Sequence, residues 1–496
     1  MAAARAPRAQ ENIWRYLHLV GGYGAAGALT LLAVLVFSRW LGPADYGRLA
    51  LFLAIGQSVV YFGTFWASNS LLRFGAEEFH GTGSLRSAFW ARAVILIPWC
   101  VVLLSILWAN RGVWQWLHAI PGLSAWWIIG FAGALVLLQS IRLSYQAVGQ
   151  TARSALWQAA EPLTWLLGAI ALGVVCRGMP QLDSVISVIV TGSSIVGVAS
   201  WLAMDRRYWW PPVVTAVDVR RFLNFSWPLL VGQTGGYLML QWVALGLLRQ
   251  WRSFEEVGMF QVAYQVMGAF QQLITLSVPV TLPMLVRLQR DAEAGRIQQY
   301  LNTLLPRALG LFALGLIGVM AAARWIIPSY LGVSYAGAIG VLNVLLVGLA
   351  CSGLCIGLIP VLQMQDRNLP LMYAMLGGGG VTLAVDLWLV PGAGGIGAAW
   401  ASAAGFFVCM LIVAAKVSQT ISWRWVSCIP ALASVFAAWA VSASGVVVWI
   451  WIDLGLLAAC LVASVKAAGW SRKRVAARTW SLESAQEPVS SIAQSS

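Results

Sequence analysis

The stretch that decides the fold is SRWLGPADYGRLALF, residues 38–52, which lies between two long apolar runs. Gly42 and Gly47 allow tight backbone geometry there. Pro43 is expected to end the first helix, because a proline ring cannot continue a helical hydrogen-bond ladder. The stretch therefore predicts a sharp turn between the first two helices.

Two charged residues stand in this turn. Arg39 and Asp45 are close enough in sequence to form a charge pair, which we expect to fix the turn at a membrane surface. A tight turn by itself implies no chemistry, but Arg39 also has the donor geometry of an anion-binding group.

The composition places the helices in a membrane. Of 496 residues, 60% are hydrophobic and only 10% are charged, which is too apolar for a soluble protein. The runs show no alternation of apolar and polar residues with period 2, which argues against a β-barrel. We expect an all-α, polytopic membrane protein of about 14 transmembrane helices. The apolar runs place them near residues 16–40, 49–68, 89–108, 126–146, 157–176, 184–204, 224–248, 257–282, 303–327, 336–362, 369–390, 396–416, 428–447 and 450–468.

The net charge of +14 could indicate a nucleic-acid partner, but the location of the charge argues against one. Lys and Arg gather in the N-terminal arm, in the loops after even-numbered helices and in the tail. By the positive-inside rule, both termini are expected in the cytoplasm.

The cysteines indicate neither a disulfide framework nor a metal site. There are seven of them, they lie in or beside apolar runs, and they form no CxxC or Cys/His cluster. No metal and no cofactor are expected.

The opening stretch has a second copy, RQWRSFEEVGMFQVAY, residues 249–264. The two copies align in order: Trp40 with Trp251, Asp45 with Glu256, and Gly47 with Gly258. Because an even number of helices separates them, we expect two pseudo-symmetric six-helix lobes around a central cavity, related by an axis along the membrane normal. The expected division is an N-terminal lobe at 1–205, a cytoplasmic linker at 206–222, a C-terminal lobe at 223–422, a helix pair at 423–470 and a disordered cytoplasmic tail at 471–496.

The turn resembles the start of the polysaccharide biosynthesis protein family, flippases of the multidrug/oligosaccharidyl-lipid/polysaccharide exporter superfamily. The resemblance rests on Arg39, Leu41, Gly42, Pro43, Tyr46 and Gly47, and on DLWLVPGAGGIGAAWA at residues 386–401. Two positions depart from the family pattern. Gln241 stands where the family commonly has an acidic residue before a glycine, and Asp386 stands where it commonly has Asn.

The resemblance implies a flippase of the bacterial inner membrane. Its substrate would be a polyprenyl-pyrophosphate-linked oligosaccharide, a repeat unit of O-antigen, capsule or exopolysaccharide, carried from the cytoplasmic to the periplasmic leaflet by alternating access. Such an anionic headgroup cannot cross hydrocarbon bare, and arginine suits its phosphates because the guanidinium donates in pairs and stays charged. The candidate cavity arginines are Arg39, Arg73, Arg142, Arg249, Arg287 and Arg324.

Arg142 and Arg324 stand out because they lie within otherwise apolar segments, although their side chains could also reach the membrane interface. Glu161 and Asp386 are flanked by apolar residues and could carry a coupling proton or cation. For both carboxylates, a structural role at a helix end is the alternative.

Most of the 28 tryptophans are expected in interfacial belts. Trp66 and Trp242 fall deeper in the apolar runs, and so they are the better candidates for stacking on a sugar.

Two other functions remain open. A membrane glycosyltransferase or polymerase of the same pathway is disfavoured, because the longest external loop, 109–125, has no carboxylate for acid/base catalysis. A cation-coupled drug antiporter is disfavoured by the basic excess. Beyond the substrate, the expected partners are membrane lipids, a polysaccharide polymerase and chain-length proteins, without nucleic acid. We expect no enzymatic activity, and coupling to a proton or sodium gradient or to the membrane potential stays open.

Overall fold

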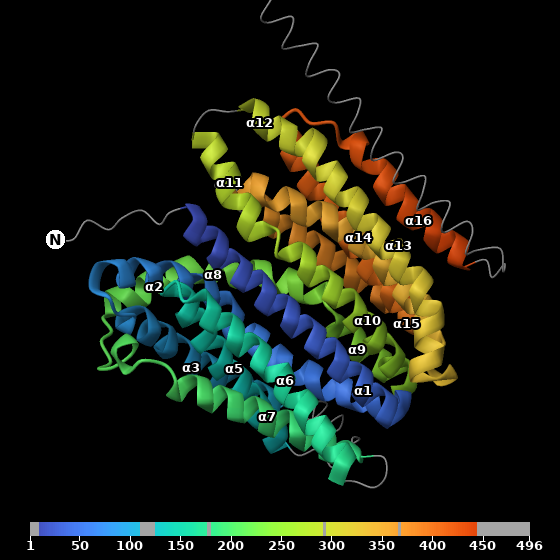
Figure 1. Cartoon of the computed structure of the whole chain (residues 1–496), viewed down its shortest axis with the longest axis horizontal. Helices are drawn as coiled ribbons and strands as arrows, with labels where there is room; N and C mark the ends of the chain where they lie inside the picture. The colour runs from blue at the N-terminus through green and yellow to red at the C-terminus, as the bar shows by residue number, and fades with distance from the viewer. Residues whose placement is uncertain (1–8, 110–124, 176–179, 291–293, 366–368, 444–496) are drawn as a thin grey trace, which may run out of the picture.

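A computed structural model describes residues 9–109, 125–175, 180–290, 294–365 and 369–443 (Figure 1). Within these ranges every regular element is helical and no strand occurs, as the composition predicts. The helices are α1 (Ala9–Thr64), α2 (Ser68–Thr82), α3 (Arg86–Ala109), α5 (Ala125–Ala147), α6 (Thr151–Val175), α7 (Leu182–Leu202), α8 (Ala216–Leu238), α9 (Gln241–Trp251), α10 (Phe254–Thr275), α11 (Val278–Arg290), α12 (Ala294–Gln299), α13 (Leu305–Ile326), α14 (Gly337–Gln363), α15 (Leu369–Ser418) and α16 (Ile429–Ala443). Short 3-10 or π segments join several of them, including η1 (Phe65–Ala67) and η4 (Ile327–Leu331).

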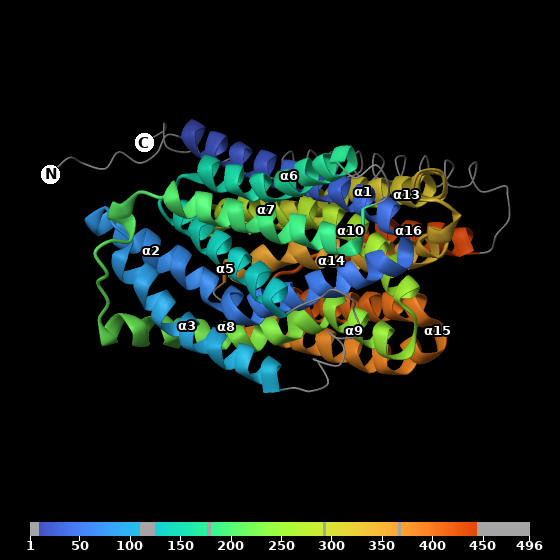
Figure 2. The same cartoon turned by 90° about the horizontal axis from the view of Figure 1, so that it is seen from below.

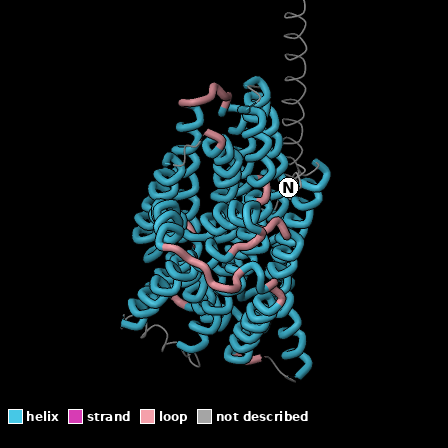
Figure 3. Tube along the Cα trace, turned by 90° about the vertical axis from the view of Figure 1, so that its left-hand side faces the viewer, coloured by secondary structure: helices cyan, strands magenta, loops and turns pink. Residues whose placement is uncertain are grey.

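Among the described residues, nine helices are long and apolar enough to cross a membrane. Several of them have apolar side chains on all sides, which is the pattern of a buried or membrane-spanning helix. The chain is therefore a multi-pass membrane protein built from helices (Figure 3). The expected last helix, 450–468, and the expected tail, 471–496, lie outside the described residues.

The sharp turn expected in residues 38–52 is a kink within a long helix. Gly42 is the non-helical residue inside α1, with φ 68° and ψ 173°. The helix therefore breaks at Gly42, one residue before Pro43, because only glycine adopts this conformation without strain. Gly394, with φ 58° and ψ −134°, makes the matching kink inside α15.

The expected charge pair between Arg39 and Asp45 is not formed. Asp45 accepts a hydrogen bond from Arg48 at 2.6 Å, one helical turn away. The Arg39 guanidinium instead lies over the Tyr330 ring, 5.0 Å from its centroid. Helix α1 resumes directly after the kink, so the residue three positions on is a nearer partner for Asp45 than one across the turn.

The two copies of the opening motif meet each other. A Cβ atom on Gly47 would lie 2.0 Å from the Phe254 carbonyl oxygen, and one on Gly258 would lie 2.0 Å from the Pro43 carbonyl oxygen. Pro43 and Phe254 occupy equivalent positions in the two copies, so the contact is reciprocal. It brings α1 and α10 side by side (Figure 2).

The helices fall on two sides of this contact. In Figures 1 and 2, α2, α3, α5, α6 and α7 lie together on one side, and α13, α14, α15 and α16 lie on the other. Helix α8 packs along α15 and also contacts α2 and α3, so it joins the two groups.

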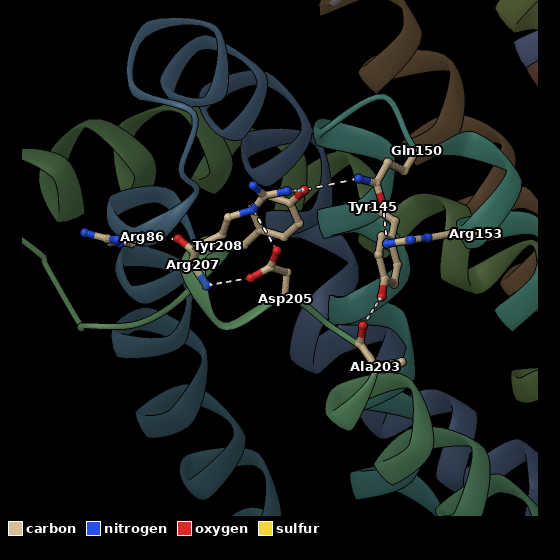
Figure 4. A network of polar contacts seen from close by, with 8 residues as sticks. All are labelled: Arg86, Tyr145, Gln150, Arg153, Ala203, Asp205, Arg207 and Tyr208. Carbon is tan, nitrogen blue, oxygen red and sulfur yellow. Dashed lines mark hydrogen bonds and ion pairs between the residues drawn. The ribbon is translucent and has the colours of Figure 1, made fainter.

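The segment between α7 and α8 is anchored to the first group (Figure 4). The Tyr208 ring is buried, and its hydroxyl accepts hydrogen bonds from Gln150 at 3.1 Å and Arg207 at 3.2 Å. Arg207 also pairs with Asp205 at 2.7 Å. We call the end of the molecule that carries this segment the linker end, and the end that carries Gly42 and Gly394 the kink end.

Helix α8 begins inside the range expected for the linker. The Thr215 hydroxyl accepts from the Asp218 backbone N–H at 3.2 Å, and the Asp218 carboxylate accepts from the Thr215 backbone N–H, also at 3.2 Å. This reciprocal cap satisfies two free N–H groups and explains why the helix starts at Ala216.

We expect Gly47→Ala to destabilise the protein by roughly 1–3 kcal/mol, because the new methyl group collides with backbone rather than with a flexible side chain. Gly133→Ala in α5 is the matched control, since a Cβ there meets nothing within 4 Å. Thermal unfolding of both purified variants in detergent measures the difference. A Gly47→Ala protein as stable as the Gly133→Ala protein would contradict the described contact.

Candidate functional site

A cavity of about 190 Å³ is lined by residues of α1, η1, α5, α6 and α9. Helices α1 and α5 supply most of its wall, and α6 and α9 supply one residue each. The lining residues are Gln57, Val60, Tyr61, Phe65, Leu135, Leu138, Gln139, Arg142, Glu161 and Trp242. Three of these, Arg142, Glu161 and Trp242, are residues singled out from the sequence.

Arg142 and Glu161 are the charged groups of this wall. Glu161 is 8% exposed, and its carboxylate accepts a hydrogen bond from the Ser193 hydroxyl at 3.3 Å. The positive charge of Arg142 acts on Glu161, but among the described residues the two form no direct ion pair. The Nε atom of Arg142 is buried and has no hydrogen-bond partner. The cavity therefore contains a cation with unused donor capacity.

Neutral polar groups hold the rest of the wall in place. The Gln139 side chain accepts from the Thr64 hydroxyl at 2.8 Å and donates to the Ser68 hydroxyl at 3.3 Å. The Tyr61 hydroxyl donates to the Gln233 side chain at 2.6 Å. Each bond joins two helices, so these side chains have little freedom to turn away from the cavity.

Trp242 of α9 completes the wall of the cavity. Its indole N–H donates to the Gln57 side chain at 3.2 Å. Its ring lies 5.0 Å from the ring of Tyr61 and 5.0 Å from that of Tyr237, measured between centroids. These neighbours form an aromatic surface of the kind that stacks on an apolar face of a sugar.

Of the other arginines singled out from the sequence, those whose side chains are described do not line this cavity. Arg73 pairs with Glu77 at 3.4 Å and lies over the Phe225 ring at 5.0 Å. Arg249 lies over the Phe254 ring at 4.1 Å, and Arg39 over Tyr330. Arg324 is not one of the lining residues, and it is partly buried near the end of α13. The side chain of Arg287 lies outside the described residues, although its backbone belongs to α11.

Trp66 and Asp386 are also separate from the cavity. Trp66 is buried beside Trp99, 6.4 Å between ring centroids, so it faces another aromatic ring rather than an open space. Asp386 is fully buried in α15, and neither of its carboxylate oxygens has a hydrogen-bond partner.

The sequence reasoning missed the neutral polar residues of the wall, Gln57, Tyr61 and Gln139. The sequence shows each of them as a polar side chain inside an uncharged apolar run. This pattern is weak evidence for a cavity, because many such side chains bond to the backbone of their own helix. It also missed Arg92, a buried arginine of α3 that lies close enough to the loop before α3 to be counted as part of the cytoplasmic charge.

The cavity can hold a small anionic or polar group, but its wall does not supply two carboxylates. Glu161 is the single acidic residue among the lining residues of this cavity. General acid/base cleavage of a glycosidic bond uses a carboxylate pair, so this wall favours binding over catalysis. In the described part of the chain, no group of three His, Cys, Asp or Glu residues could hold a metal ion.

We expect Arg142→Gln and Glu161→Gln each to lower the melting temperature, and the double variant to lower it by less than the sum of the two. Each single change leaves one buried charge without its counter-charge, whereas the double change removes both. Thermal unfolding of the three proteins in detergent measures this coupling. Strictly additive effects would show that the two charges do not interact.

Comparison with known proteins adds a family and a fold. Residues 16–289, more than half of the chain, match the family model described as polysaccharide biosynthesis protein. No curated protein matches the chain at a significant level.

Several solved transporters share the fold. The lipid II flippase MurJ in an inward closed conformation aligns with a TM-score of 0.64 at 14% identity, covering 91% of this chain and 97% of that chain. A multidrug resistance MATE family transporter of the MOP superfamily, in an outward-facing conformation, aligns with a TM-score of 0.56 at 12% identity, covering 82% and 96%. A MOP superfamily transporter from Pyrococcus furiosus aligns with a TM-score of 0.55 at 12% identity, covering 86% and 96%. At these identities the likeness shows a common fold.

Proposed function

We propose that the chain, which belongs to the polysaccharide biosynthesis protein family, is a flippase for a polyprenyl-pyrophosphate-linked oligosaccharide. The substrate would be a repeat unit of O-antigen, capsule or exopolysaccharide, carried from the cytoplasmic to the periplasmic leaflet of a bacterial inner membrane. Both termini would lie in the cytoplasm, and a polysaccharide polymerase with its chain-length proteins would receive the product. The proposal assigns no enzymatic activity and no cofactor.

The observation that carries the proposal is Arg142 in its cavity. Its buried Nε has no partner, and Trp242 stands in the same wall. A guanidinium with a free donor binds a phosphate group, and an aromatic ring stacks on a sugar. A lipid-linked sugar carries both features next to each other, so one wall can recognise the junction between pyrophosphate and sugar.

Alternating access requires contacts that can separate at the linker end. There, Glu77 of α2 accepts a hydrogen bond from Arg221 of α8 at 2.8 Å, with both side chains about half exposed. The Ser70 and Ser226 hydroxyls are also in hydrogen-bond contact across this seam. Exposed ion pairs contribute little to stability, so the Glu77–Arg221 pair opposes the separation of α8 from α2 only weakly.

Asp386 is the candidate for ion coupling. A buried carboxylate without any partner is unfavourable when charged, so it tends to hold a proton or bind a cation. An inside-negative potential already drives an anionic headgroup outward, by about 2.3 kcal/mol per charge per 100 mV. In our proposal, a proton or cation at Asp386 therefore resets the empty transporter rather than supplying the outward step.

The two alternatives have less support. An enzyme of the same pathway would need a second acidic group near Glu161, which the cavity wall lacks. A drug antiporter would need an acidic wall to bind a cationic drug, whereas this wall contains Arg142.

We expect deletion of the gene in its native bacterium to abolish the surface polysaccharide, while the lipid-linked repeat unit accumulates on the cytoplasmic leaflet. A gene with Arg142→Ala should restore export to at most about a tenth of the level that the unmodified gene gives, because the change removes the cavity cation. Arg206→Gln, an exposed residue of the linker end, should restore it fully. If the repeat unit instead reaches the outer leaflet and stays unpolymerised, the flippase proposal fails and an enzyme of the same pathway is the better explanation.

We expect Asp386→Asn to remove any dependence of flipping on an imposed proton or sodium gradient. Asparagine fills the same volume, but it neither titrates nor supplies a negative charge. Flipping by protein reconstituted in liposomes, with and without each gradient, measures this effect. Asp183→Asn, at an exposed helix start, is the control. A gradient dependence that survives in Asp386→Asn places the coupling group elsewhere.

A further inference from the structure

Arg92 in α3 is the most deeply buried arginine of the described residues, with 3% of its surface exposed. One of its nitrogens, Nη1, donates to the Ser140 hydroxyl at 2.7 Å. Its Nε and Nη2 atoms are also buried and have no partner. Arg92 takes part in none of the ion pairs found in the described ranges. A buried cation with unused donors is costly, and function is the usual reason for keeping one inside a membrane protein.

The surroundings of Arg92 add a second unpaired donor. The nearby Glu78 carboxylate of α2 accepts from the backbone N–H groups of Ser87 and Ala88. Ala88 and Leu96, one turn to either side of Arg92, belong to a buried cluster with Trp66 and with Phe222 of α8. The Trp66 indole N–H is buried in this cluster without a partner. Unpaired N–H groups of Arg92 and Trp66 are therefore both buried next to this cluster.

We propose that Arg92, assisted by Trp66, binds a phosphate group of the lipid-linked substrate near the linker end. The guanidinium fork fits two phosphate oxygens, and an indole N–H supplies a third donor. This inference rests on the proposed function, and it adds a second phosphate site to the cavity already described.

Helix α5 connects the two sites. Ser140, which holds Arg92, stands two residues before Arg142 on the same helix. Arg92 itself lies about 9 Å along α3 from Arg86 at the linker end. On α5, Arg142 lies about 7.5 Å along the axis from Ala147, which is at the linker end, so Arg92 and Arg142 lie at similar depths from that end.

Access to Arg92 depends on α8. In the described state α8 packs against α2 and α3, and it contributes Phe222 to the cluster that covers this region. The Ser70–Ser226 and Glu77–Arg221 contacts hold it there. Separation of α8 from α2 and α3 is therefore the step that exposes Arg92 to the substrate.

The test measures binding of farnesyl pyrophosphate, a short prenyl pyrophosphate, to the purified full chain by calorimetry. We expect Arg92→Gln to weaken binding by at least about tenfold, and Trp66→Phe to weaken it by about threefold, since it removes one neutral donor. Arg206→Gln should bind as the unmodified protein does. Unchanged binding by Arg92→Gln would falsify the proposal. If Arg92→Gln does not fold, unchanged binding by Trp66→Phe overturns it.

Phospholipid headgroups carry the same phosphate chemistry, so dioleoyl phosphatidylglycerol serves as a second probe. If Arg92→Gln weakens only the binding of phosphatidylglycerol, the site belongs to a membrane lipid and the proposal fails. A third arm uses Ser70→Cys with Ser226→Cys. Oxidation of this pair should lock α8 against α2 and abolish the Arg92-dependent binding, and reduction should restore it. Binding that survives the cross-link contradicts the role of α8.

Failure of this inference differs from failure of the proposed function. A protein that flips the lipid-linked repeat unit in liposomes, but whose binding of farnesyl pyrophosphate does not depend on Arg92, loses only the second site. A protein that neither flips the repeat unit nor binds farnesyl pyrophosphate loses both.

Discussion

The backbone contact between the two glycine turns, Gly47 on Phe254 and Gly258 on Pro43, sets the position of every other element. Two helices approach this closely only where neither carries a side chain at the point of contact. The contact brings α1 against α10, and the remaining helices are arranged on either side of that pair. Further along α1, Gln57, Val60 and Tyr61 line the cavity with Arg142.

The charged residues in the two copies of the turn bind different partners. In the first copy, Asp45 pairs with Arg48 inside its own turn. In the second, Glu256 accepts from the Gly395 backbone N–H at 3.1 Å, and Arg252 donates to the Val390 carbonyl at 3.4 Å. The second copy thereby fixes the kink of α15. A weak sequence repeat can thus keep its backbone geometry while its charged residues take different partners.

The helices could be predicted from the sequence, but the contacts between their side chains could not. Long apolar runs identify helices because nothing else satisfies the backbone inside a bilayer, and Gly42 marked the first kink correctly. Arg142 and Glu161 were visible as charges inside such runs. Which arginines face one cavity depends on how each helix is rotated about its axis. Helices such as α3 and α14 have apolar residues on every side, so their sequences do not indicate this rotation. Arg92 was hidden for a related reason, since a charge near a loop satisfies the positive-inside rule whether it faces water or the protein interior.

The anchored segment at the linker end determines where the chain can bend. The Tyr208 hydroxyl accepts from Gln150 and the Arg207 carbonyl accepts from Arg86, which tie the segment to the first group of helices, and Trp90 donates to the Trp209 carbonyl at 2.6 Å. Helix α8 starts with its own cap at Thr215. The extended residues 211–214 are thus the only stretch between two fixed points. A tether this short gives α8 the freedom to tilt about its first turn, while its start cannot drift away from α2 and α3. If the two groups of helices move relative to each other, as the proposed alternating access requires, this short segment favours rocking about the corner over sliding.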